Sequence, residues 1–192
     1  MSSLSGHVTQ EELFETLKTA NNKQAWKGVT QVFIAYLTLE EHTEKCISGL
    51  FTILHQQDLS QEILRDIDRC FKEEDKRNFI TQELVFTFLE KLPASTSNND
   101  LDGFFEWLGY ESRRNPLYAM ELTEILVEKF ETTINAELFW HTEPLIAALN
   151  EILREADERD NPKLIQRAIS LQDRFLILGI PGMEELLNKA GQ

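Results

Sequence analysis

Apolar residues recur every three or four positions along most of this chain, the spacing that gives an α-helix one buried face. The clearest set is Ile47, Leu50, Phe51 and Leu54, at i, i+3, i+4 and i+7. The same periodicity predicts helices over 11–17, 23–37, 60–71, 81–92, 116–130, 144–156, 162–178 and 183–187. The sequence therefore predicts an all-α protein of eight to ten helices, arranged as an irregular helical array or bundle.

Capping residues mark where several of these helices begin and end. Two segments have capping-box spacing, Thr9–Glu12 and Thr38–Glu41. Asp58 or Ser60 is available to cap the helix that follows. Further signals are Asn before Pro at two helix starts, Pro144 at a third, and Gly179 with Pro181 after the last long helix.

Two segments depart from the simple pattern. Residues 81–92 contain Val85, Phe86 and Phe88, whose local preference leans toward strand. The helical spacing of Val85, Leu89 and Leu92 favours a helix there. Residues 101–114 contain two glycines and four aromatic residues, which predicts a short, interrupted helix.

The segment 93–100, PASTSNND, has the composition of a linker. It divides the chain into an N-terminal helical half, 1–92, and a C-terminal helical half, 101–192. One continuous domain remains the alternative.

The C-terminal half contains a repeated pattern. Asn115-Pro116 and Asn161-Pro162 lie 46 residues apart, and the apolar positions that follow keep the same offset. The paired positions are Tyr118 with Leu164, Ala119 with Ile165, Leu122 with Ala168, Ile125 with Leu171, and Phe130 with Leu176. With this period, residues 115–190 resemble a HEAT/armadillo-like helical repeat, which implies stacked helix pairs in that half.

The N-terminal half shows no matching 46-residue pattern, so an irregular bundle or two small helical domains stay open as alternatives. If the C-terminal half is a stack, the last long helix belongs to its terminal unit. Its polar side chains are then expected to face water; they are Lys163, Gln166, Arg167, Gln172 and Asp173.

Charge changes which partners are expected. Acidic residues number 33 and basic residues 19, so the net charge is −14. Such a chain repels a phosphate backbone, which argues against direct nucleic-acid binding and favours a protein partner with a basic surface. Solubility alone is the simpler explanation of the charge.

No apolar run is long enough to span a bilayer, and the N-terminal residues lack the pattern of a signal peptide. Cys46 and Cys70 lie in apolar periodic segments and in no CxxC motif, so we expect buried free thiols. These features together predict a cytoplasmic protein without membrane contact.

Motifs that carry chemistry are missing from the sequence. His42 and Cys46 have i, i+4 spacing, which could form half of a zinc site, but no second pair follows. The sequence contains no P-loop, no GxSxG, no GxGxxG and no HExxH motif. We therefore expect no enzymatic activity, no cofactor and no metal.

The candidate binding residues are a compact group of aromatic and arginine side chains, the types that dominate interface hot spots. They are Phe104, Phe105, Trp107, Tyr110, Arg113 and Arg114. A partner-binding patch is one interpretation, and packing at the seam between the two halves is the favoured one. Phe139, Trp140 and His141 present the same choice, with a core position favoured.

Three functions follow as hypotheses. The first is a non-enzymatic protein–protein interaction module, such as an adaptor, scaffold or regulatory subunit, because a helix array offers a broad groove. The second is an acidic inhibitor or immunity-type protein that occludes a basic or nucleic-acid-binding site. The third is an all-helical enzyme without a recognisable motif.

Overall fold

The fold is described from a computed structural model. It describes residues 12, 23–39, 43–56, 59–93, 96, 101–131 and 143–177. The chain divides into two compact units, the first comprising residues 1–70 and 74–91, the second residues 71–73 and 92–192. Each unit is helical, and no strand occurs in the described residues.

Eight α-helices and one short 3-10 helix make up the described part of the chain, which confirms the all-α prediction. The α-helices are α2 (Lys23–Tyr36), α3 (Thr43–Leu54), α4 (Gln61–Lys72), α5 (Gln82–Lys91), α6 (Asp102–Arg114), α7 (Pro116–Glu131), α8 (Glu143–Glu158) and α9 (Pro162–Ile177). The 3-10 helix, η1, spans Arg77–Phe79.

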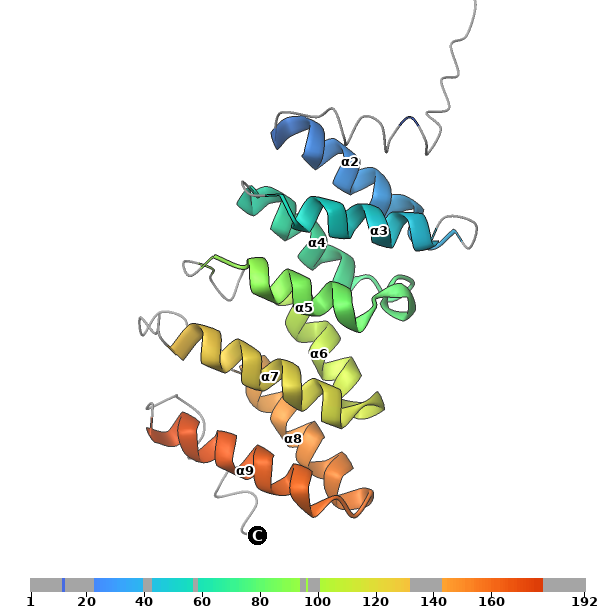
Figure 1. Ribbon diagram of the computed structural model, residues 1–192. Helices are drawn as coiled ribbons and strands as arrows, with labels where there is room; N and C mark the ends of the chain where they lie inside the picture. Colours follow the sequence, from blue (N-terminus) through green and yellow to red (C-terminus); the bar gives the residue numbers. More distant parts are fainter. Residues whose placement is uncertain are drawn as a thin grey trace, which may run out of the picture. The chain divides into compact units, whose positions relative to one another are not determined.

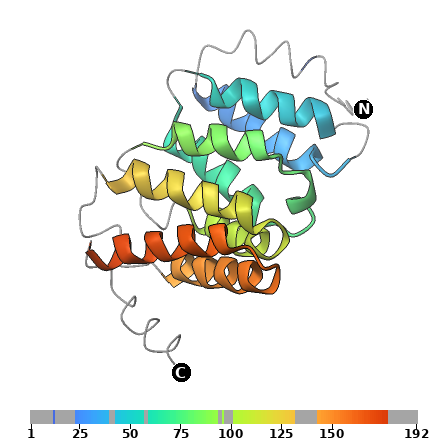
Figure 2. The ribbon, with the colours of Figure 1, turned by 60° about the horizontal axis from the view of Figure 1, so that its bottom comes forward.

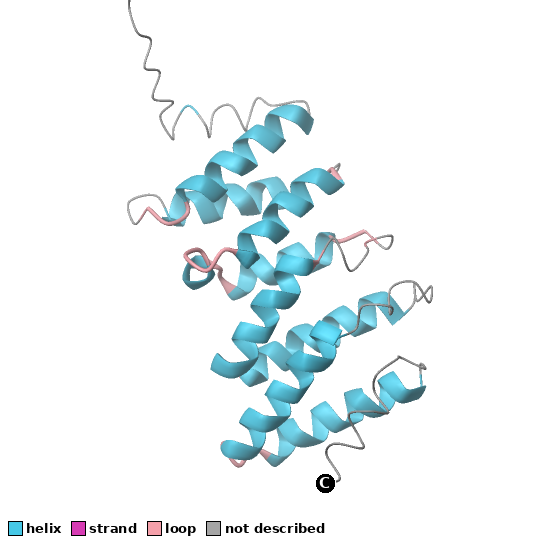
Figure 3. Cartoon of the chain, turned by 180° about the vertical axis from the view of Figure 1, so that it is seen from behind, coloured by secondary structure: helices cyan, strands magenta, loops and turns pink. Residues whose placement is uncertain are grey.

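In the first unit, helices pack both on their chain neighbour and on the next helix but one. α2 packs on α3, and α3 packs on α5 (Figure 1). Side chains also join α2 to α4, because Lys27 Nζ lies 2.8 Å from Glu62 Oε2 and Gln31 Nε2 donates to Asp66 Oδ2 at 3.0 Å. α3 and α5 thus share one layer, and α2 and α4 share the other (Figure 3).

The second unit has the same two-layer arrangement. α6 packs extensively along α8, and α7 packs more loosely along α9. Contacts between chain neighbours, α6 with α7, α7 with α8 and α8 with α9, hold the two layers together (Figure 2). Stacked helix pairs therefore occur in both units, although the sequence pattern predicts them only in the C-terminal half.

The core of the first unit follows the apolar periodicity closely. All five apolar residues of α4 are buried, as their helical spacing predicts: Ile63, Leu64, Ile67, Cys70 and, assigned to the second unit, Phe71. On α2, the helical spacing of Val29, Phe33 and Tyr36 predicts one buried face, but only Val29 and Phe33 are buried and Tyr36 is 44% exposed. A Cβ on Gly49 of α3 would lie within 3 Å of three atoms of the Phe33 ring, so glycine permits this close approach of α2 and α3.

An aromatic cluster forms part of the second unit's core. The Trp107 ring centroid lies 6.0 Å from that of Phe71, 6.3 Å from Phe104 and 6.1 Å from Tyr118. The Tyr118 ring is nearly perpendicular to the indole of Trp107, which is the edge-to-face geometry that aromatic pairs prefer. This cluster fixes α6 against α7 and the end of α4.

The two helix starts that repeat in the sequence also repeat in the structure. Asn115 Oδ1 accepts a hydrogen bond from the Tyr118 amide at 3.5 Å, and Asn161 Oδ1 accepts one from the Leu164 amide at 3.2 Å. Each is the N-cap interaction with the third helical amide. α7 and α9 are both 16 residues long, so the 46-residue offset corresponds to two equivalent helices.

A tight turn joins α8 to α9. The Asn161 amide donates to the Ala156 carbonyl and the Asp160 amide to the Asp157 carbonyl, the paired bonds of a Schellman motif. Asp160 has a φ of +50°, the left-handed conformation that glycine usually provides at this position. The turn between α8 and α9 therefore forms without a glycine at its left-handed position.

The predictions for three further helices have different outcomes. α6 is one continuous helix rather than an interrupted one, because its buried aromatic face stabilises it and a Cβ at Gly109 would meet nothing within 4 Å. α3 is described from Thr43 onward, and the capping box expected over Thr38–Glu41 includes residues outside the described part of the chain. The helix of 81–92 is confirmed as α5, with Thr81 Oγ1 accepting from the Leu84 amide.

Other predictions fall outside the described residues. They are the helices over 11–17 and 183–187, the capping residues Thr9, Glu40, Glu41, Asp58, Gly179 and Pro181, and the residues His42, Phe139, Trp140 and His141.

Candidate functional site

The predicted binding residues on α6 fall into two groups. Phe104, Phe105 and Trp107 are at most 7% exposed and belong to the core of the second unit. Tyr110 is half-buried, and Arg113 and Arg114 are exposed. The structure thus leaves three of the six side chains accessible.

Those three accessible residues are held by neighbouring groups. The Arg114 guanidinium carbon lies 5.2 Å from the Tyr110 ring centroid, a cation–π geometry. Arg113 pairs with Glu151 of α8 at 3.4 Å, and its carbonyl oxygen accepts a hydrogen bond from Arg159 at 3.0 Å. Arg113 therefore serves to join α6 to α8.

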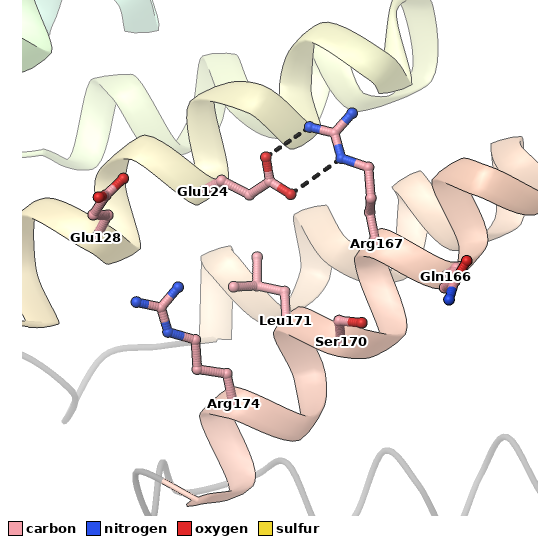
Figure 4. A pocket seen from close by; sticks show the side chains of 7 residues that line it. All are labelled: Glu124, Glu128, Gln166, Arg167, Ser170, Leu171 and Arg174. Carbon is pink, nitrogen blue, oxygen red and sulfur yellow. Dashed lines mark hydrogen bonds and ion pairs between the residues drawn. The ribbon is translucent and has the colours of Figure 1, made fainter.

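A groove lies between α7 and α9 in this unit (Figure 4). Its volume is about 520 Å³, and it is open to solvent along one side. α7 contributes two carboxylates, and α9 contributes two guanidinium groups together with smaller side chains. The lining residues are Glu124, Glu128, Gln166, Arg167, Ser170, Leu171 and Arg174.

One part of the groove is closed by an ion pair. Arg167 donates from Nε to Glu124 Oε1 at 3.1 Å and from Nη2 to Glu124 Oε2 at 2.6 Å. This two-point geometry is the strongest that an arginine and a carboxylate can form. The hydrogen bond to Glu124 is the main reason why the pKa of Arg167 is raised, and the nearby Glu121 adds to the effect.

The other part of the groove has Glu128 on the α7 side and Arg174 on the α9 side (Figure 4). Glu128 is exposed and forms no ion pair with any described residue. Leu171 lies between the two parts, and at 4% exposure it provides a buried apolar base. The groove thus combines an apolar base with a charged rim.

Helical spacing explains this arrangement. Glu121, Glu124 and Glu128 occur at i, i+3 and i+7 on α7 and so share one face of that helix. Arg167, Leu171 and Arg174 occur at i, i+4 and i+7 on α9. The Glu124–Arg167 pair shows that these two faces are turned toward each other.

Sequence reasoning missed this groove. It assigned Gln166 and Arg167 to a polar face in contact with water, and both are indeed accessible. The same reasoning placed Gln172 on that face, but this side chain is buried. A signal was present in the acidic triplet on one helix and the basic pair 46 residues later, but only the packing of α7 on α9 brings them together.

Other chemical features of the described residues are sparse. Cys46 and Cys70 are buried free thiols, and burial raises the pKa of Cys46, which lowers its reactivity. Within the described part of the chain no three His, Cys, Asp or Glu residues are grouped closely enough to hold a metal ion. No helix there has the length and apolar character that crossing a membrane requires.

Comparisons of the chain with models of protein families, with curated proteins and with solved structures find no match. The fold and the groove together define an α-helical array of stacked pairs that carries a charged groove. Its function is inferred from that geometry.

Proposed function

We propose that this protein is a non-enzymatic protein-binding module, an adaptor, scaffold or regulatory subunit, which binds its partner in the groove between α7 and α9. The single observation that carries this proposal is the groove itself, about 520 Å³ with Leu171 at its base and charged residues around its rim. An apolar centre surrounded by polar groups is the usual organisation of a protein interface.

The size of the groove favours a polypeptide segment as the ligand. It can hold one or two side chains, whereas its open side leaves room for the rest of a chain to pass along α7 and α9 (Figure 4). Stacked helix pairs also provide a rigid frame, since each helix is held by its neighbours in both layers. The resemblance to HEAT/armadillo-like repeats supports the same function, because such arrays bind proteins along their stacked helices.

A groove-filling substitution tests this proposal. Ser170 is exposed and lines the groove, so Ser170→Trp should occupy it without disturbing the core. Tagged full-length protein is used to recover partners from its native cell, and the recovered proteins are compared between variants. We expect Ser170→Trp to lose at least one protein that the unmodified chain recovers.

Ser48→Trp is the matched control, because Ser48 is an exposed serine on α3, in the first unit. The control should recover the same proteins as the unmodified chain. Circular dichroism and thermal unfolding confirm that both variants are folded. Equal recovery by the folded Ser170→Trp variant would exclude the groove as the binding site.

A further inference from the structure

We infer that the groove binds a basic polypeptide segment, with one lysine or arginine side chain paired with Glu128 and a second with Glu121. This inference rests on the proposed function, because it specifies the partner of the same groove. Three observations carry it: the state of the groove's own cations, the availability of two carboxylates, and the position of Leu171.

The cations on the α9 side are already engaged. Arg167 donates two hydrogen bonds to Glu124, at 3.1 and 2.6 Å. Arg174 also takes part in an interaction of its own. An acidic partner would have to displace Glu124 from a two-point ion pair before it could bind Arg167.

Two exposed carboxylates lie on either side of that pair on the same face of α7: Glu128 lines the groove, and Glu121 lies beyond its lining residues. Glu121 and Glu128 are exposed, and neither forms an ion pair within the described residues. They lie seven residues apart on one face of α7, which corresponds to about 10 Å along the helix axis. In a polyproline II segment, which has three residues per turn, two basic side chains three positions apart lie on the same side and are about 9 Å from each other, close to the same distance.

Leu171 suits the aliphatic part of a basic side chain. It lies between the α7 and α9 walls, next to the space that Glu128 borders (Figure 4). Lysine and arginine carry long apolar stems that cover apolar surface while their charged ends stay in a polar environment. A stem above Leu171 would bring its charged end to the Glu128 carboxylate.

Long-range electrostatics acts in the same direction. The chain carries a net charge of −14, which attracts a basic segment before contact is made. Binding should therefore weaken as salt is added, because screening reduces both the attraction at a distance and the exposed ion pairs.

Two synthetic peptides serve as probes in a nuclear magnetic resonance titration of the isotope-labelled full chain. One has six residues with lysine at the second and fifth positions and alanine elsewhere, and the other has glutamate in place of lysine. We expect the lysine peptide to shift amide signals of α7 and α9 and the glutamate peptide to bind more weakly. The Glu121→Gln/Glu128→Gln variant should bind the lysine peptide about fivefold more weakly, as the loss of two exposed ion pairs predicts.

Glu83→Gln/Asp157→Asn is the control variant, because it removes two negative charges from exposed residues outside the groove. It should change the affinity less than twofold. Equal weakening in both double variants would show attraction by net charge alone and would overturn the inference, as would tighter binding of the glutamate peptide. Partner recovery separates the two proposals: loss in Ser170→Trp with normal recovery in Glu121→Gln/Glu128→Gln would keep the groove as the binding site and reject a basic partner.

Discussion

Gly49 shows how a single residue sets the distance between two helices. Its missing side chain lets the Phe33 ring of α2 rest directly against the backbone of α3, where any Cβ would overlap three ring atoms. Phe33 is fully buried, so the ring has little room to move away. The sequence pattern predicts both helices, but it contains no sign of this contact.

Gly49→Ala should therefore destabilise the protein by about 1–2 kcal/mol, since the cost of overpacking exceeds the gain in helix propensity. Gly28→Ala is the matched control, because Gly28 also lies in a helix but a Cβ there would meet nothing within 4 Å. It should stabilise the protein by about 0.5–1 kcal/mol. Urea unfolding measures both changes, and a stabilised Gly49→Ala variant would contradict the described packing of α2 on α3.

Asp160 carries a conformational cost at the turn between α8 and α9. It has a φ of +50°, a backbone conformation that is disfavoured for residues other than glycine. Asp160→Gly should stabilise the protein by about 0.5–1 kcal/mol. Asp157→Gly removes the same charge from the last turn of α8, inside the helix, and should change stability by less than about 0.5 kcal/mol. Equal effects of the two substitutions on the free energy of unfolding would argue against the Schellman turn.

At the scale of elements, the two asparagine caps are the part of the repeated pattern that can be tested most simply. Asn161→Ala removes the hydrogen bond to the Leu164 amide and should cost about 1 kcal/mol. Asn115→Ala should cost less, because its bond to the Tyr118 amide is longer, at 3.5 Å. Asn161→Asp keeps an acceptor at the same place and should retain most of the stability. Thermal unfolding of the three variants checks this order.

The sequence predicts most of the helices because their apolar periodicity alone determines which face is buried. α4 is the best example, because all five of its apolar residues lie in the core. α6 was predicted wrongly because local propensity counts two glycines against a helix, whereas burial of Phe104, Phe105 and Trp107 stabilises it.

At the scale of the whole molecule, stacked helices occur in more of the structure than the repeated sequence pattern predicts. Both units stack helices in two layers, but only α7 and α9 share a recognisable 46-residue pattern. Layering requires only an amphipathic face of suitable width on each helix, and different residues can provide that face. Stacking can therefore occur in the first unit without any sequence similarity to the second.

The groove could not be predicted from the sequence for a related reason. Its walls come from helices that lie 46 residues apart, and each wall by itself reads as an ordinary solvent-facing surface. The aromatic group on α6 has the composition of a binding site, but three of its members are buried in the second unit. Amino-acid composition alone does not distinguish a binding site from a hydrophobic core. The packing of α6 places these three aromatic residues in the core.

The most direct test of the proposed function is to detect a partner in contact with the groove. A photo-reactive phenylalanine derivative is incorporated at Ser170 of the full chain in its native cell, and at Ser48 in a parallel culture. After illumination, we predict a crosslinked protein with the probe at Ser170 that is absent with the probe at Ser48. The same crosslinked products at both positions, or none at Ser170 from a folded protein, would contradict the proposal that the groove between α7 and α9 binds a protein.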